Sequence, residues 1–251
     1  MHDNDFSGEV PSSIQNLTNL FHLDLSINDF TGDMPDFFDK MTRLNYLFLS
    51  ENDYFTPGPI PTTLGALSNL EELSLKGTLR EGPIPEFLGT NLTNLILLDL
   101  DNNDLNDTIP ANLGDLTDLQ FLLLNRNPDL SGQVPASFSQ LSALRLVYLD
   151  NTNLEGSMET LCALPTLTET SGDEDGEEIV SADCGGSFPQ MTDCPCCDFC
   201  CDKDNNIATC HDDFGTPNLK PNWEYGFDRY DFDFGDGETY FEARKYVGRL
   251  P

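Results

Sequence analysis

The chain has 251 residues, and its 44 acidic against 12 basic side chains give a formal net charge of −32 at pH 7. A phosphate-binding surface needs clustered lysine and arginine, so this composition argues against nucleic acid and anionic membrane surfaces as partners. No apolar run approaches the ~20 residues of a membrane-spanning helix, so no membrane span is expected in this chain. The acidic charge is expected to keep a long exposed surface soluble, with binding of divalent cations as the alternative.

Leucines recur in a fixed pattern from the N-terminus to about Leu161, and successive repeats are 24 to 26 residues apart. The alternation of apolar and variable residues at the end of each leucine group has the period of a short strand. We therefore predict one strand in each repeat of a repetitive architecture. The apolar groups are Leu20-Leu23-Leu25, Leu44-Leu47-Leu49, Leu70-Leu73-Leu75, Leu95-Leu98-Leu100, Leu119-Leu122-Leu124 and Leu144-Val147-Leu149.

Each repeat continues with a polar residue and then a proline. The polar residues follow the last leucine by three positions and are Asn28, Asn52, Thr78, Asn103, Asn127 and Thr152. An amide both donates and accepts, so it can tie one coil to its neighbour; the coils with threonine are expected to be looser. The prolines are Pro11, Pro35, Pro61, Pro85, Pro110 and Pro135. Proline turns the chain without donating a hydrogen bond, and segments such as 62–70 and 111–119 are expected to return as a short helix or 3₁₀ turn.

These residues resemble the plant-type leucine-rich repeat, with the pattern LxxLxLxxNxLxGxIPxxLgxLtxL, over residues 4 to about 161. The resemblance implies an α/β fold: a right-handed solenoid of six to seven coils with a parallel concave β-sheet and a short helical or 3₁₀ convex side. The third coil departs from the pattern by two extra residues around Tyr54 to Pro59. Met1 leads directly into the middle of a repeat, without a signal peptide or a polar N-terminal cap, so we expect an N-terminally incomplete chain.

The remaining sequence divides into residues 162–210, a cysteine-rich C-terminal cap, and residues 211–251, an acidic aromatic tail. The cap carries an acidic insert at 171–178 and a strand at 179–184, and residues 230–243 of the tail are expected to form a hairpin. Asp202, Asp204, Asn206 and Asp213 faintly resemble a calcium-binding loop, but the expected glycine is missing. The cysteine spacing resembles the C-terminal flank of secreted leucine-rich-repeat proteins from diatoms and related algae.

Disulfides are the expected state of the eight cysteines, which are Cys162, Cys184, Cys194, Cys196, Cys197, Cys200, Cys201 and Cys210. A bond from Cys162 to Cys184 is the preferred single pair, because it would join the last coil to its cap. The other six cysteines can pair in 15 ways, which stay open. Two alternatives remain: redox CxxC spacing at Cys197 and Cys200, and metal-ligand spacing at Cys194, Cys197 and Cys200.

The concave face is the candidate ligand-binding surface, since strand residues between the core leucines stack there in columns about 4.8 Å apart. The first column is His22, Tyr46, Glu72, Leu97, Phe121 and Leu146. The second is Asp24, Phe48, Ser74, Asp99, Leu123 and Tyr148, and the third is Ser26, Ser50, Lys76, Asp101, Asn125 and Asp150. Exposed apolar clusters at Tyr46 with Phe48, and at Phe121, Leu123, Leu146 and Tyr148, would suit a ligand. The alternative is that strands favour aromatic residues in any case.

The predicted function is extracellular recognition of a protein, peptide or carbohydrate ligand by a secreted or receptor-like module. The resemblance leaves two alternatives, an inhibitor of a secreted hydrolase similar to polygalacturonase inhibitors, and a structural or surface-binding protein. No enzyme is expected, since none of the three histidines has a nucleophile at a recognisable motif, and neither a cofactor nor a metal is expected. The full-length product could still be anchored in a membrane. Three sequons, at Asn16, Asn91 and Asn106, are candidate glycosylation sites.

Overall fold

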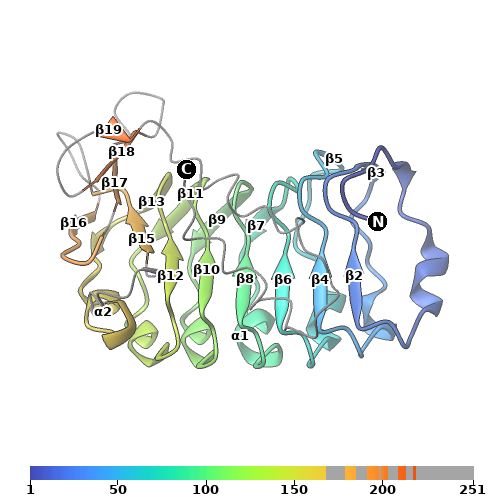
Figure 1. Cartoon of the computed structure of the whole chain (residues 1–251), viewed down its shortest axis with the longest axis horizontal. Coiled ribbons are helices and arrows are strands. Elements are labelled where there is room, and N and C mark those ends of the chain that lie inside the picture. The colour runs from blue at the N-terminus through green and yellow to red at the C-terminus, as the bar shows by residue number, and fades with distance from the viewer. Residues whose placement is uncertain (168–178, 185–190, 198, 203–208, 213–216, 219–251) are drawn as a thin grey trace, which may run out of the picture.

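The computed structural model describes residues 1–167, 179–184, 191–197, 199–202, 209–212 and 217–218. The chain winds as a curved solenoid whose strands lie side by side from the N-terminal coil to the C-terminal cap (Figure 1). This is a leucine-rich-repeat fold, as the spacing of leucine, asparagine and proline predicts. The acidic insert, the tail hairpin and most of the calcium-loop-like segment lie outside the described residues.

A ten-stranded sheet forms the inner face of the arc. Its strands pair in parallel from the first to the eighth, and the last two pairings are antiparallel. In spatial order they are β2 (His22–Asp24), β4 (Tyr46–Phe48), β6 (Glu72–Ser74), β8 (Leu97–Asp99), β10 (Phe121–Leu123), β12 (Leu146–Tyr148), β15 (Ile179–Ala182), β17 (Phe199–Asp202), β18 (Thr209–Asp212) and β19 (Pro217–Asn218). The six predicted repeat strands and the predicted cap strand are therefore present.

Shorter sheets run along the edge where each coil leaves the inner sheet. The first contains β1 (Ser7–Glu9), β3 (Asp29–Gly32) and β5 (Tyr54–Phe55). The second contains β7 (Glu81–Pro83), β9 (Asp104–Thr108), β11 (Asn127–Gly132) and β13 (Thr152–Leu154), and a separate pair joins β14 (Gly156–Ser157) to β16 (Met191–Asp193). The gap between β5 and β7 coincides with the two-residue insertion at 54–59, and a single bridge from Gly58 to Arg80 crosses it.

The convex side consists of short helical turns. Prolines precede most of these turns, and the proline carbonyl accepts the first hydrogen bond, as from the Ile14 amide to Pro11. The turns are η1 (Ser12–Asn16), η2 (Phe38–Lys40), η3 (Thr62–Ala66), α1 (Phe87–Asn91), η4 (Ala111–Asp115), η5 (Ala136–Gln140), α2 (Glu159–Cys162) and η6 (Pro165–Leu167). No helix within the described ranges is long and apolar enough to cross a membrane.

The asparagine column ties the coils together. The Asn103 amide nitrogen donates to the carbonyl oxygens of Leu75, Leu100 and Asp101, at 2.9 to 3.0 Å. Its Oδ1 atom accepts from the backbone amides of Thr78 and Arg80. A buried asparagine therefore satisfies main-chain groups of two successive coils, which would otherwise be left without partners.

Threonine makes fewer of these hydrogen bonds in the fourth coil, where a buried arginine supplies others. The Thr78 hydroxyl has a single proton to donate, and its Oγ1 atom lies 2.7 Å from Leu75 O and 3.5 Å from Asn103 Oδ1. Arg80 is only 2% exposed, and its guanidinium donates to the carbonyl oxygens of Thr78, Thr56 and Pro59. Burial lowers the pKa of Arg80 below its ordinary value, against the opposing effect of Glu81 and Asp33. This side chain fills the turn that the insertion creates.

The residue before each asparagine or threonine of the asparagine column has left-handed backbone geometry. Its φ lies between +51° and +58° at Asp3, Ile27, Glu51, Gly77, Asn102, Arg126 and Asn151. Glycine and asparagine adopt this region readily, whereas a β-branched side chain such as that of Ile27 is strained there. The coil geometry is therefore imposed on residues that do not favour it.

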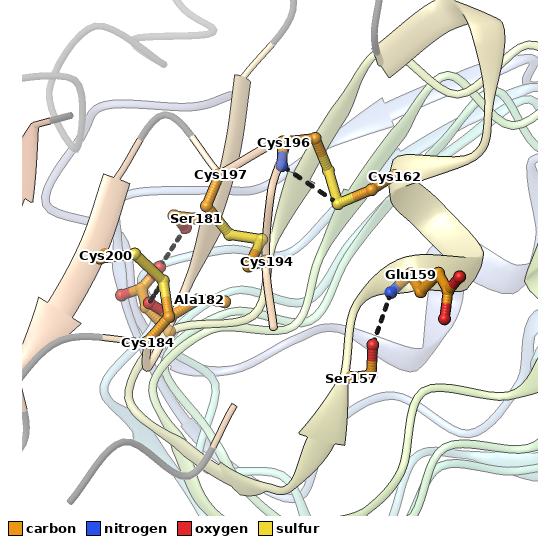
Figure 2. The surroundings of a disulfide bond; sticks show 11 residues. Ser157, Glu159, Cys162, Ser181, Ala182, Cys184, Cys194, Cys196, Cys197 and Cys200 are labelled. Atoms are coloured by element: carbon orange, nitrogen blue, oxygen red, sulfur yellow. Dashed lines mark hydrogen bonds between the residues drawn. A yellow bond between two sulfur atoms is a disulfide. The ribbon is translucent and has the colours of Figure 1, made fainter. Parts of the chain in front are cut away.

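Three disulfides are placed among the described residues; one joins the helix α2 to the cap, two lie within the cap, and none is the predicted pair. Cys162 bonds to Cys196, Cys184 bonds to Cys200, and Cys194 bonds to Cys197 (Figure 2). The predicted Cys162–Cys184 bond is wrong for a topological reason. β16 pairs with β14 and leads the 194–197 loop to Cys162 at the end of α2, whereas Cys184 follows β15, which lies beside β17 and Cys200.

The remaining predictions for the cysteines concern redox and metal chemistry. Cys197 and Cys200 belong to different disulfides, so their spacing does not form a CxxC bond. Cys194, Cys197 and Cys200 are all oxidised here, so none of the three offers the thiolate that a metal ligand requires. Cys201 is also disulfide-bonded, and it lies opposite Cys210 in the β17–β18 pair.

Candidate ligand-binding surface

The three predicted columns run across the inner sheet in the predicted register. His22 pairs with Tyr46, Tyr46 with Glu72, and the series continues through Leu97 and Phe121 to Leu146. The second column follows two residues later on the same strands. Backbone hydrogen bonds continue the pairing past the third column, for example from the Asn102 amide to Asn125 O and from the Arg126 amide to Asp150 O.

An aromatic group lies at the N-terminal end of these columns. The His22 ring meets the rings of Tyr46 and Phe48 edge to face, with centroid distances of 5.7 and 5.8 Å. The Tyr46 hydroxyl donates to a carboxylate oxygen of Glu71 at 3.1 Å. Phe48 is fully buried, whereas His22 and Tyr46 are half-buried, so these two rings remain accessible in part.

The second apolar group is buried, and the prediction that it is exposed is wrong. Leu97, Phe121, Leu123, Leu146 and Tyr148 form a cluster separate from the solenoid core, and none of them is more than 4% exposed. They occupy adjacent positions on three neighbouring strands, where large apolar side chains pack on one another and lose solvent contact. A ligand that used these side chains would have to gain access to a packed cluster.

Polar residues of the inner face bond to one another across the coils. The Ser50 and Ser74 hydroxyls are 2.5 Å apart, and Ser74 Oγ also lies 2.8 Å from Asp99 Oδ2. Asp101 accepts two hydrogen bonds from the Arg126 guanidinium in a side-by-side arrangement. Such pairs hold the side chains in fixed positions.

Of the fifteen residues predicted to bind ligand, four keep partial exposure. These are His22, Asp24, Tyr46 and Lys76, and Lys76 pairs with Glu51 at 2.7 Å. The remaining eleven are buried: Phe48, Glu72, Leu97, Asp99, Asp101, Phe121, Leu123, Asn125, Leu146, Tyr148 and Asp150. The register brings all fifteen onto one face, but solvent reaches mainly the side of that face nearer the N-terminus.

Asp150 is a buried carboxyl on this face whose pKa is raised. It is 6% exposed and forms a short hydrogen bond with the Ser181 hydroxyl of the cap strand β15. Desolvation by burial raises the pKa of Asp150 to about 7, with further increases from the charges of Asp183 and Asp101 that the serine hydrogen bond opposes. This carboxyl therefore changes its charge near neutral pH.

A hollow of about 520 Å³ lies at the N-terminal end, away from the predicted columns. Five acidic residues line it, namely Asp3, Asp5, Asp29, Glu51 and Asp53. Ile27 and Tyr54 also belong to the lining. The sequence alone does not reveal it, because the hollow depends on how the first three coils stack. Ser181 and Asp183 are inner-face residues that the sequence prediction does not include. Their positions after the core residue Val180 in the cap strand would have predicted this placement, because Ser181 pairs with Tyr148 of the second column.

Comparisons with known proteins agree with this geometry. The Leucine Rich Repeat family model matches residues 19–41 and 94–116. Over 67 residues the chain is 45% identical to a probable LRR receptor-like serine/threonine-protein kinase of Arabidopsis thaliana, which covers 27% of this chain and 6% of that protein.

The chain is also similar to solved structures of receptor kinase ectodomains. The LRR ectodomain of the membrane receptor kinase GASSHO1/SCHENGEN3 from Arabidopsis thaliana, in complex with CASPARIAN STRIP INTEGRITY FACTOR 2, matches with a TM-score of 0.62 and 32% identity, over 66% of this chain and 19% of that one. The Arabidopsis receptor kinase HAESA, in complex with the peptide hormone IDA and the co-receptor SERK1, matches with a TM-score of 0.53 and 26% identity, over 62% of this chain and 30% of that one. The chain thus spans less than a third of each of these relatives.

The parallel inner sheet, the proline-led convex turns and the asparagine column define a leucine-rich-repeat protein. The chain is a plant-type leucine-rich-repeat domain related to the ectodomains of LRR receptor-like kinases. The resemblance of the cysteine-rich segment to algal proteins stays a prediction.

Proposed function

We propose that this domain is a non-catalytic extracellular recognition module that binds a peptide across its concave sheet. The observation that carries the proposal is the inner sheet itself, which presents three registered columns of non-core side chains. The similar ectodomain of HAESA was solved with a peptide hormone and a co-receptor, and this relation favours a peptide over a carbohydrate. A co-receptor is a further expected partner.

The dimensions of the sheet set the expected ligand length. Strands β2 to β12 are six neighbours at about 4.8 Å spacing, which gives a track of about 24 Å. An extended peptide covers at most ~3.6 Å per residue, so about seven or eight residues lie across the columns. The partly exposed Tyr46, His22 and Lys76 are the contacts expected first, with Tyr46 as the aromatic anchor.

A binding assay with short synthetic peptides tests the proposal. The chain is immobilised and screened against extended peptides, and binders are then measured against a Tyr46→Ala/Lys76→Glu variant. Lys40→Glu makes the same charge change on the convex turn η2 and serves as the matched control. We expect the concave variant to lose at least about tenfold in affinity, since truncation of an anchor costs about 2 kcal/mol or more, while the control keeps the wild-type affinity.

Two results would contradict the proposal. Equal loss in the concave and convex variants would place the contact elsewhere. Inhibition of a polysaccharide-degrading hydrolase, without binding of any peptide, would favour the inhibitor function instead.

A further inference from the structure

The junction between the last leucine-rich coil and the cap contains a row of buried hydrogen-bond acceptors. Four oxygen-bearing side chains continue the third column into the cap: Asp101, Asn125, Asp150 and Asp183. All four are at most 6% exposed. Asp101 satisfies its charge with Arg126, but Asn125 Oδ1 has no hydrogen-bond partner among the described residues. A buried acceptor without a donor costs free energy, so this column has an unmet need for one.

Asp183 accepts two backbone hydrogen bonds at this junction. Its two carboxylate oxygens accept from the backbone amides of Asn151 at 2.8 Å and Thr152 at 3.0 Å. In the earlier coils the amide corresponding to Asn151 donates to a main-chain carbonyl, as Asn102 does to Asn125 O. The cap thus replaces a neutral carbonyl by a carboxylate, and two N–H donors stabilise its negative charge.

Asp150 has neither the arginine partner of Asp101 nor the two backbone amides of Asp183. Ser181 on β15 is its hydrogen-bond partner, and β15 pairs directly with β12 through Tyr148 and Ser181. The charged side chains that act on Asp150 are Asp183 from the cap and Asp101 from an earlier coil. Arg126 forms an ion pair with Asp101.

We propose that the column Asp101, Asn125, Asp150 and Asp183 is a proton-binding site through which pH controls how firmly the cap holds to the last coil. A proton on Asp150 removes the repulsion between its carboxylate and those of Asp183 and Asp101. Asn125, whose Oδ1 atom has no hydrogen-bond partner among the described residues, lies between Asp101 and Asp150 in the same column. The closed cap therefore binds this proton more tightly than an opened cap, in which water solvates the carboxylate.

The direction of the pH effect follows from this difference. In the closed cap the pKa of Asp150 is about 7, against an ordinary value of 3.8 when the carboxyl is exposed. Between these values the closed state holds a proton that the open state has lost, so cap stability falls as pH rises. Above about pH 7 both states are ionised and the contribution of Asp150 levels off at its lowest value.

Hydrogen exchange of the whole chain tests the proposal without a ligand. Amide exchange in β15 is measured from pH 5 to pH 8 and corrected for the intrinsic rate. Asp150→Asn keeps the shape and supplies a donor at every pH, and Asp129→Asn removes an exposed carboxylate as the matched control. Relative to Asp150→Asn, the wild type and the control should show an opening equilibrium that rises about 90-fold over this range.

Equal pH dependence in the wild type and Asp150→Asn would overturn the proposal. A carboxyl NMR titration of the unaltered protein provides a test that needs no variant to fold. A midpoint for Asp150 above pH 6 supports the proton site, and a midpoint at or below pH 6 overturns it.

Discussion

The guanidinium of Arg80 donates to the main-chain carbonyl of Thr56 at 2.6 Å, and so links the fourth coil to the insertion of the third. Two further donors of the same side chain satisfy the carbonyl oxygens of Thr78 and Pro59. A charged side chain that is 2% exposed is stable here because its donors meet fixed acceptors. The arginine therefore performs a structural role that asparagine performs in other coils.

Arg80→Met should destabilise the solenoid. The apolar replacement keeps much of the volume but leaves three carbonyl groups without a donor, and we expect a loss of about 3 kcal/mol in the free energy of unfolding. Urea unfolding followed by circular dichroism measures it. Arg43→Met, at an exposed convex position, is the control and should change stability by less than about 0.5 kcal/mol; equal effects would show that Arg80 is not a structural link.

The asparagine column predicts a large effect at Asn103. Asn103→Ala removes hydrogen bonds to five main-chain groups, all within two adjacent coils, so we expect a loss of about 3 kcal/mol or more. Asn69→Ala removes one exposed bond, to Thr42 O, and should cost less than about 1 kcal/mol. Chemical denaturation measures the free energy of unfolding of both variants. A loss at Asn103→Ala no larger than that at Asn69→Ala would mean that water replaces the hydrogen bonds of the Asn103 amide.

A stabilising change is expected at Ile27. Its φ of +51° is unfavourable for a β-branched residue, whereas asparagine occupies the equivalent position at Asn102 with a φ of +55°. Ile27→Asn should therefore raise the free energy of unfolding by about 1 kcal/mol. The reverse change, Asn102→Ile, should lower it by a similar amount. Thermal unfolding of the two variants gives the answer, and the same sign for both would disprove the backbone explanation.

The cap disulfides should differ in their contribution to stability. The Cys184–Cys200 bond closes a loop with a separation of 16 residues and Cys194–Cys197 one of 3 residues. In the loop-entropy model, removal of the first bond by a double Cys→Ala change costs about 3 kcal/mol and removal of the second costs less. Amide exchange in β15 and β17 measures the loss. Peptide mapping without reduction should recover Cys162 linked to Cys196, and recovery of a Cys162–Cys184 peptide would refute the pairing.

Glycosylation provides a test of the proposed extracellular setting. Asn16 is exposed on η1, whereas the Asn91 side-chain nitrogen donates to Gly65 O at 3.0 Å. A glycan is attached at this nitrogen, so Asn16 should be occupied more fully than Asn91 when the chain is secreted from a eukaryotic host. Mass spectrometry of the two peptides measures occupancy. Higher occupancy at Asn91 would show that its hydrogen bond offers no protection.

The repeat architecture was predictable because it depends on local periodicity. Leu98 and Leu100 alternate with Leu97 and Asp99 on one short strand, and Asn103 and Pro110 follow at fixed distances. These residues determine which side chains point into the core and which onto the inner face. The strands, their register and the convex turns follow from that pattern.

Features that depend on the path of the chain were not predictable in the same way. Cys162 meets Cys196 rather than Cys184 because β16 crosses to β14, and no spacing rule encodes that crossing. Phe121 and Tyr148 are buried in a cluster with Leu97, Leu123 and Leu146, and strand periodicity does not report such packing. The altered proton affinity of Asp150 likewise requires its neighbours Ser181 and Asp183 to be placed in space.

The division of the outer strands at residues 54–59 has a mechanical consequence. The inner sheet is one continuous band from β2 to β19, but the outer strands form separate sheets. Between β5 and β7 the outer backbone hydrogen bonds run from the Gly58 amide to Leu79 O and from the Glu81 amide to Gly58 O. A force that bends the arc is therefore resisted here by the inner sheet and by an isolated outer bridge, without a continuous pair of outer strands. The curvature of the molecule is therefore most easily changed at its third coil, which makes this coil the compliant element of an otherwise stiff arc.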